Sequence, residues 1–307
     1  MAREILTHHW GYVSAIGSAM LFGISSTLNK IALANVNPTV IAGMVYFIGG
    51  IVLFAVHVSP LRNKILKIFE TPGTEANFSK RDFGILTMVI VCGSVVAPFL
   101  LLNGLSQTTA INASLLLNAE AFFTFLIAFT FLKERCCRKE YLGFVLLLVG
   151  VVFVTTNGTF QGISFFRNLA GNVLIISACL FWGLDNNLSK FLSKKRDLLA
   201  VTALKCFVGG SALLIMSFVL GFSFNIPLVA VPYLLSVGAF SIAFSILLFL
   251  FALRKLGSMR TGVIFSTSSL FGAALAFAVL GESFTLIQFA AGLIMILGVY
   301  VIYRCRS

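Results

Sequence analysis

The sequence predicts an all-α integral membrane protein with ten transmembrane helices, arranged as two inverted five-helix repeats. Composition is the first observation behind this prediction. Of 307 residues, 59% are hydrophobic and 10% are charged, and the mean hydropathy is +1.03. A soluble globular domain carries about 25% charged residues, so a water-soluble fold of this length is not expected.

Ten apolar runs are each long enough to cross a hydrocarbon core, which takes about 20 helical residues. The runs cover residues 10–34, 38–58, 83–105, 108–132, 139–157, 168–189, 198–220, 228–253, 259–280 and 285–303. The start of the chain is too short and polar for a signal peptide, so the first run is expected to remain as a helix. Because the connections are short, apart from residues 59–82, consecutive helices should be antiparallel.

The net charge of +12 is explained by where the basic residues lie. If the N-terminus is cytoplasmic, every Lys and Arg falls in a cytoplasmic segment except Lys30, Arg167 and Lys205. This distribution follows the positive-inside rule. It places both termini in the cytoplasm and the chain in the cytoplasmic membrane, and it needs no nucleic-acid partner.

The second observation is that the chain aligns with itself. At an offset of 160 and then of 148, matching residues include Phe47 with Phe207, Gly49-Gly50 with Gly209-Gly210, and Glu134 with Glu282. The alignment divides the chain into repeats at 1–157 and 158–307, each with five spans. Since five is odd, the second repeat must enter the membrane in the opposite orientation, an arrangement typical of secondary transporters.

The residues LFGISSTLNK (21–30) and LFWGLDNNLSK (180–190) end the first helix of each half. With the five-plus-five plan and with Glu134 and Glu282 ending helices 4 and 9, they resemble the EamA-like branch of the drug/metabolite transporter superfamily. The resemblance covers essentially the whole chain. It implies a central cavity between the halves, lined chiefly by the first, third and fourth helices of each repeat, with the fifth helices peripheral. It does not identify a substrate, because transporters of amino acids, metabolites, drugs and nucleotide sugars share this architecture.

Glu120 is a carboxylate in the middle of the fourth apolar run, on the same helical face as Thr124. An ionised side chain that faced lipid there would cost at least ~2.5 kcal/mol, so Glu120 must face protein or water. One interpretation is a cavity residue that binds an amine or takes up a proton. The other is an acid that links helix 4 to a neighbouring helix by hydrogen bonding.

Asp185 and Lys205 should reach similar depths in the antiparallel helices 6 and 7. They could neutralise each other as an ion pair, or Lys205 could extend toward the cytoplasmic interface. A third possibility is that Lys205 receives a carboxylate while Glu120 receives the amine of the same zwitterionic substrate.

The first helices of the two halves carry an aromatic residue one turn from a polar cluster. The repeat pairs Phe22, Ser25, Ser26 and Asn29 with Trp182, Asp185, Asn186 and Ser189. Aromatic rings with a few convergent polar groups are typical of small-molecule pockets. The alternative is that Phe22 and Trp182 only pack in the core.

The helix-end positions of Glu134 and Glu282 favour a structural role over the alternative, a role in gating. Thr285 and Gln288 have the spacing of a capping box at the start of helix 10, and Glu282 should lie beside the positive end of that helix. Pro98 predicts a kink in helix 3, since it lacks a backbone N–H and clashes with the preceding turn. The kink could be a hinge for alternating access or a fixed bend.

An enzyme is not predicted, because neither H-E-x-x-H nor G-x-S-x-G occurs and the three histidines lie near the expected helix ends. The six cysteines have no paired spacing, so no metal or cofactor is expected. The sequence predicts a proton-coupled exporter of a small organic metabolite that works by alternating access, as a monomer or homodimer in the lipid bilayer. A passive facilitator, an exchanger or an uptake carrier of the same fold is the alternative.

Overall fold

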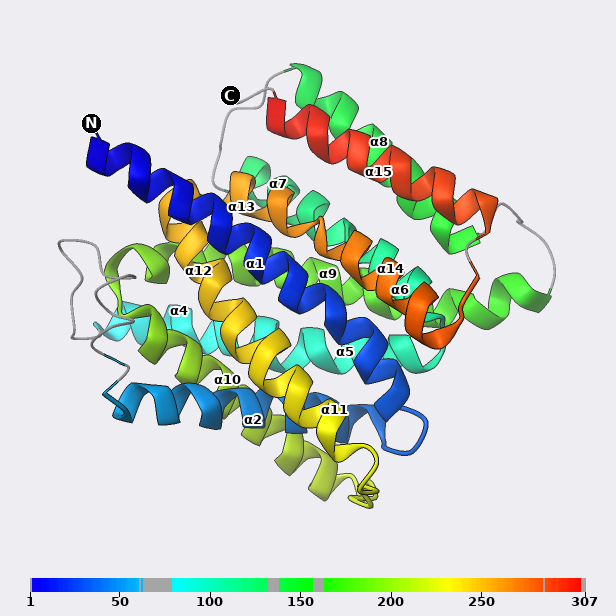
Figure 1. Cartoon of the computed structure of the whole chain (residues 1–307), viewed down its shortest axis with the longest axis horizontal. Helices are drawn as coiled ribbons and strands as arrows, with labels where there is room; N and C mark the ends of the chain where they lie inside the picture. The colour runs from blue at the N-terminus through cyan, green and yellow to red at the C-terminus, as the bar shows by residue number, and fades with distance from the viewer. Residues whose placement is uncertain are drawn as a thin grey trace.

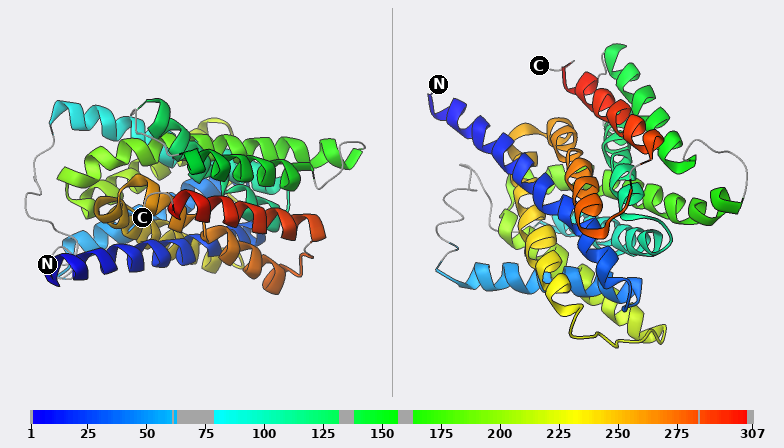
Figure 2. Two further views of the ribbon diagram at one scale, coloured as in Figure 1. Left: turned by 90° about the horizontal axis from the view of Figure 1, so that it is seen from above. Right: turned by 45° about the vertical axis from the view of Figure 1, so that its right-hand side comes forward.

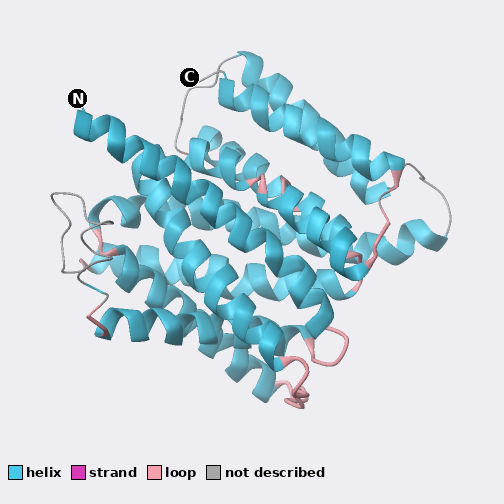
Figure 3. Cartoon of the chain, in the orientation of Figure 1, coloured by secondary structure: helices cyan, strands magenta, loops and turns pink. Residues whose placement is uncertain are grey.

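The computed structural model describes residues 2–60, 62, 79–131, 138–156, 163–283 and 285–304. Within these ranges the chain consists of helices and loops, with no strand (Figure 3). Seven described helical segments are long and apolar enough to cross a membrane: Trp10–Ala32, Pro38–Val58, Lys80–Ser106, Ala110–Thr130, Leu169–Lys194, Leu198–Val219 and Val231–Leu256. Shorter apolar helices cover Tyr141–Gly150, Ser268–Leu280 and Leu286–Gly298. The chain is therefore a multi-pass membrane protein.

The helices of the first half of the chain follow the predicted apolar runs closely. They are α1 (Ala2–Ala32), α2 (Pro38–Val58), α4 (Lys80–Ile90), η1 (Val91–Val96), α5 (Ala97–Ser106), α6 (Ala110–Leu116), α7 (Ala119–Thr130) and α8 (Arg138–Thr156). The second half holds α9 (Ile163–Lys195), α10 (Leu198–Val219), α11 (Val231–Ser236), η2 (Val237–Phe244), α12 (Ser245–Leu256), α13 (Ser258–Phe265), α14 (Ser268–Leu280) and α15 (Leu286–Arg304). In Figure 1, α1 begins and α15 ends toward the same side of the molecule.

The second helix of each half begins with the same kind of cap. Asn37 Oδ1 accepts a hydrogen bond from the Thr39 N–H at 2.9 Å, and Asp197 Oδ1 accepts from the Leu199 N–H at 2.9 Å. Asn and Asp are favoured at this position because they satisfy N–H groups that the first helical turn leaves free. Asn37 and Asp197 are 160 residues apart, the offset of the sequence repeat.

Two predicted spans, 83–105 and 228–253, each contain a π-helical segment, η1 and η2. The η1 segment lies directly before Pro98, and at its end the Ala97 N–H bonds to Cys92 O, five residues back. No proline lies in η2, so a proline is not required for this geometry. π-Helical turns are rare and occur often at functional sites.

The predicted spans 108–132 and 259–280 are not continuous α-helices. A tight turn at Leu117–Asn118 separates α6 from α7, and the Glu120 N–H bonds to Leu117 O at 3.0 Å. A second turn at Ser266–Thr267 separates α13 from α14. At these turns the backbone bonds reach three residues back instead of four, which tightens the helix. Asn118 interrupts the apolar run at the first turn, and four consecutive hydroxyl residues, 266–269, occupy the second. The predicted spans nevertheless ran through both turns as single helices.

Helices from the two halves of the chain interleave. The helix α1 packs against α12 and α14, whereas α9 packs against α5 and α7 (Figure 1). The first helix of each half is therefore embedded among the third and fourth helical passages of the other half. At the edge of the molecule, α8 and α15 lie side by side (Figure 2).

Candidate functional site

A small cavity lies where α1, α2, η1, α7, α9, α10, α12 and α13 meet. The volume within which the centre of a water molecule can lie is about 40 Å³. A single buried water needs about 10–15 Å³ on this measure, so the cavity has room for a few waters or one small chemical group. Its wall combines three charged side chains with an aromatic cluster.

Lys205 and Asp185 form a buried ion pair on one side of this cavity. The Lys205 ammonium on α10 donates to Asp185 Oδ2 on α9, and the two side chains are only 5% and 4% exposed. Ser189 Oγ, one helical turn further along α9, donates to Asp185 Oδ1 at 2.9 Å. Of the three roles left open for Lys205, this geometry corresponds to the ion pair.

Glu120 lies on α7, directly after the turn at Leu117–Asn118, and only 7% of its surface is exposed. The Asn186 side chain on α9 donates to Glu120 Oε1 at 2.8 Å and to Thr124 Oγ1 at 3.1 Å. Glu120 therefore lines the cavity and also links α7 to α9. The hydrogen bond to Asn186 corresponds to the linking interpretation, whereas binding of an amine or a proton stays a prediction.

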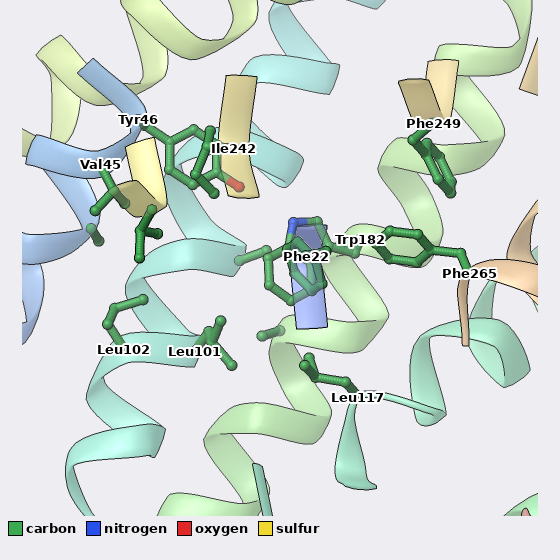
Figure 4. Close-up of a cluster of buried hydrophobic side chains, with 14 of the residues drawn as sticks. Phe22, Val45, Tyr46, Leu101, Leu102, Leu117, Trp182, Ile242, Phe249 and Phe265 are labelled. Atoms are coloured by element: carbon green, nitrogen blue, oxygen red, sulfur yellow. The ribbon is translucent and has the colours of Figure 1, made fainter. Parts of the chain in front are cut away.

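Four aromatic rings also line the cavity, namely those of Phe22, Trp182, Phe249 and Phe265. Phe22 packs edge-on against Trp182, with ring centroids 5.8 Å apart, and lies 5.1 Å from the Phe265 ring. The rings of Phe249 and Phe265 are 4.9 Å apart. Figure 4 shows Phe22 and Trp182 between Tyr46 on one side and Phe249 and Phe265 on the other. Phe22 and Trp182 thus have both proposed properties, since they pack together and line the cavity.

Gly93 in η1 lies against both an aromatic residue and a charged residue of the cavity. Its carbonyl accepts hydrogen bonds from Trp182 Nε1 at 3.0 Å and from the Tyr46 hydroxyl at 3.3 Å. A side chain at Gly93 would overlap the Asp185 carboxylate. The glycine therefore lets α9 approach η1 closely enough to place Trp182 and Asp185 in the cavity.

Several cavity residues were not predicted from the sequence, namely Tyr46, Gly93, Ser245, Ile246, Phe249 and Phe265. A glycine within a long apolar helix is a weak signal that could have indicated Gly93 as a point of close approach. No sequence signal separates Phe249 and Phe265 from the other phenylalanines, of which the chain has 32.

Ser25 and Asn29 are buried on α1 but do not line the cavity. Ser25 Oγ and Asn29 Oδ1 have no hydrogen-bond partner among the described residues. They follow Phe22 along α1, away from the aromatic cluster. The structure therefore separates these two candidates from the charged group around Glu120.

Glu282 has a different partner from the one predicted. Its carboxylate accepts hydrogen bonds from the N–H groups of Ala110 and Ile111 at 2.9 and 2.8 Å, so it caps α6 and not the helix that follows it. Gly281 ends α14 with φ 64°, a left-handed conformation that redirects the chain beside α6. The predicted capping box of Thr285 and Gln288 is present, with bonds of 2.9 and 3.2 Å. Glu134 lies outside the described residues.

The sequence profile of the EamA-like transporter family matches residues 9–156 and 169–304. The chain belongs to the EamA-like transporter family. This EamA-like protein is 42% identical to a protein of Methanothermobacter thermautotrophicus over 96% of its own length and 86% of the relative's. A Clostridium kluyveri protein is 25% identical over 89% and 86% of the two chains. Both relatives carry the name uncharacterized transporter.

A solved crystal structure aligns with the EamA-like protein at a TM-score of 0.67 and 15% sequence identity. The alignment covers 97% of this chain and 99% of the other. At this identity the match concerns the fold alone. The family match, the transporter-named relatives and the apolar helices together make this protein a membrane transporter, and the family resemblance predicted from its residues is confirmed.

Proposed function

We propose that this EamA-like transporter is a proton-coupled exporter of a small organic metabolite and that it works by alternating access. The observation that carries the proposal is Glu120, a buried carboxylate that lines the cavity where both halves of the chain meet. Intramembrane ionisable residues are costly and mark substrate or proton pathways. Glu120 exchanges a proton as the cavity opens to one side of the membrane and then to the other.

The proposed topology has ten spans, divided into two repeats at 1–157 and 158–307 with opposite orientations. The protein lies in the cytoplasmic membrane, and both termini are in the cytoplasm. The two family matches, at 9–156 and 169–304, support the division into repeats. The interleaving of α1 with α12 and α14, and of α9 with α5 and α7, supports a two-fold relation. The positive-inside distribution of Lys and Arg supports the orientation.

Polar contacts at each end of the helices support two gates. At one end, Lys30 on α1 donates to Leu105 O at 2.7 Å and to Thr108 O, which ties α1 to the end of α5. At the other end, Arg196 forms an ion pair with Asp82. In the proposed cycle these contacts break alternately, because the cavity can exchange its contents only when the helices at one end separate.

The test is transport in proteoliposomes with and without an imposed pH gradient, with a panel of amino acids, amines and related metabolites. Wild-type protein should accumulate at least one solute when the gradient is present. Glu120→Gln should lose this accumulation, because its amide cannot exchange a proton. Glu282→Gln is the matched control, because it makes the same carboxyl-to-amide change at a helix end and should keep gradient-driven transport.

Two results would count against proton coupling. If wild type only equilibrates solutes regardless of the gradient, the protein is a passive facilitator. If Glu120→Gln accumulates solute as well as wild type does, Glu120 links α7 to α9 without a coupling role.

A further inference from the structure

The cavity holds two acidic side chains and one basic side chain, Glu120, Asp185 and Lys205. Asp185 and Lys205 are already paired with each other. With both carboxylates ionised, the net charge of the three groups is therefore negative, and the excess charge belongs to Glu120. From this geometry we propose that the cavity binds the ammonium group of a small organic amine, in exchange for a proton at Glu120. This inference rests on the proposed transport function and names its substrate class.

The paired state of Lys205 argues against an amino acid as substrate. A zwitterion needs a cationic partner for its carboxylate, and Lys205 is the only cationic side chain that lines the cavity in the described residues. Its ammonium is held by Asp185, so a substrate carboxylate would have to displace a buried partner. Breaking a buried ion pair is strongly unfavourable, because it leaves an uncompensated charge. An amine needs no such rearrangement.

The aromatic wall favours the same class of ligand. Phe22, Trp182 and Phe265 present rings to the cavity that contains Glu120. Aromatic faces attract organic cations through their quadrupole, and more strongly where water is excluded. The hydrocarbon part of an amine can pack on the same rings. A carboxylate with the same hydrocarbon part would pack on the rings as well, but it would lack the attraction between ring and cation and would meet the negative charge of Glu120.

The charge balance also explains why exchange would be coupled. When either a proton or an ammonium group occupies Glu120, the three cavity groups and their occupant sum to zero charge. When Glu120 is ionised and unoccupied, the cavity carries a net charge that is costly to move through the membrane interior. The empty carrier is therefore disfavoured, and each amine exported replaces a proton taken up.

The titratable groups around Glu120 come from several helices. Asp185 on α9 and Lys205 on α10 are the charged side chains that act on it. Tyr46 on α2 and Cys179 on α9 are the neutral titratable neighbours. Since Asp185 and Lys205 neutralise each other, a proton released when an amine binds should come from Glu120.

Isothermal titration of the purified full-length protein in nanodiscs tests the proposal with four ligands of similar hydrocarbon shape. They are 3-methylbutylamine, L-leucine, 4-methylpentanoate and 3-methylbutanol, which present a cation, a zwitterion, an anion and a neutral group. The amine should bind at least about tenfold more tightly than each of the others. Glu120→Gln should lose this preference, whereas Glu282→Gln should keep it.

A second measurement on wild type covers the case in which Glu120→Gln does not fold. The amine is titrated in two buffers with different heats of ionisation, at a pH where Glu120 is protonated. The difference in heat should reveal release of about one proton per bound amine. Equal or tighter binding of leucine, no binding of the amine, or amine binding without proton release would each overturn the proposal.

Because no gradient is used, these results are separable from those of the transport test. Amine binding with no gradient-driven transport would contradict the proposed function alone. Gradient-driven transport of another solute, with no amine binding, would contradict the substrate class alone.

Discussion

Phe47 on α2 and Phe207 on α10 stack with their ring centroids 5.2 Å apart and their planes 30° apart. The two residues are 160 positions apart, which is the offset of the sequence repeat. Each phenylalanine also lies against a glycine of the other helix, Phe207 against Gly50 and Phe47 against Gly210. The two second helices of the repeats therefore cross where both backbones lack a side chain, which permits the close approach typical of membrane helices.

Bulky side chains at this crossing should destabilise the protein. A Cβ on Gly50 would lie 2.6 Å from the Phe207 backbone nitrogen, and Gly210 is equally enclosed by Phe47. Gly50→Leu and Gly210→Leu should each lower the free energy of unfolding by about 1–3 kcal/mol or more, since overpacking forces backbone shifts. Thermal unfolding in detergent, followed by loss of the monodisperse peak in size-exclusion chromatography, measures this.

Gly84→Ala is the matched control for these substitutions. Gly84 lies in α4, and a Cβ there would meet nothing within 4 Å. Alanine is favoured over glycine within a helix by about 0.5–1 kcal/mol, so this variant should be at least as stable as wild type. A Gly210→Leu protein as stable as Gly84→Ala would show that α2 and α10 do not pack as described.

The same double glycines show how much of the fold can be predicted from the sequence. Hydrophobic run length predicted the approximate positions of the helices, because lipid imposes a minimum length on each span, but not the turns that divide two of them. The repeated Gly-Gly pair predicted a shared feature of two helices, although not that these helices touch. The interleaving of α1 and α9 with the opposite halves was not predicted, because apolar helices carry no signal that selects their neighbours.

The candidate site was predicted in part for a related reason. Glu120, Asp185 and Lys205 are conspicuous because a charge in an apolar run needs a partner or water. Their partners depend on three-dimensional packing, and Glu282 illustrates this, since it caps α6 and not the adjacent helix. Phe249 and Phe265 could not be predicted, because an aromatic residue has the same sequence context whether it faces lipid or the cavity.

The Asp185–Lys205 pair should behave as a coupled unit in stability measurements. Asp185→Asn and Lys205→Met should each cost about 3–5 kcal/mol, because each leaves one buried charge without its partner. The double variant should recover a large part of this loss, since it buries neither charge. Chemical denaturation of the four proteins of this double-mutant cycle measures the interaction.

Two findings would contradict this role for the pair. Additive losses in the double variant would indicate that Asp185 and Lys205 act independently. Single variants with wild-type stability would indicate that water or ions in the cavity compensate each charge.

The proposed membrane orientation predicts a pattern of thiol labelling. In a cysteine-free background, Asn225→Cys lies in the exposed loop before α11 and should react with a membrane-impermeant maleimide in intact cells. Lys80→Cys, at the exposed start of α4, should react only after permeabilisation. The reverse pattern would overturn the assignment of both termini to the cytoplasm, and labelling of both sites in intact cells would contradict their placement on opposite sides.

Glu282 should stabilise α6 through a contact between distant parts of the chain. Among the described residues, the Thr109 hydroxyl accepts a hydrogen bond from the Asn112 N–H, at 3.1 Å, and the N–H groups of Ala110 and Ile111 donate to the Glu282 carboxylate. Glu282→Ala would leave both groups without this acceptor at the positive end of the helix. The expected loss is about 0.5–2 kcal/mol, the range for removal of a helix cap.

Glu282→Gln separates hydrogen bonding from charge at this position. Its amide keeps one acceptor oxygen, so its stability should lie between those of wild type and Glu282→Ala. Thr109→Ala removes the local cap of the same helix and should cost about 1 kcal/mol.

Because Glu282 follows α14 and α6 belongs to the first half, only Glu282→Ala should also loosen the contact between α14 and α6. Faster hydrogen exchange in both helices of Glu282→Ala, but only in α6 of Thr109→Ala, would support this role, and identical exchange in the two variants would refute it.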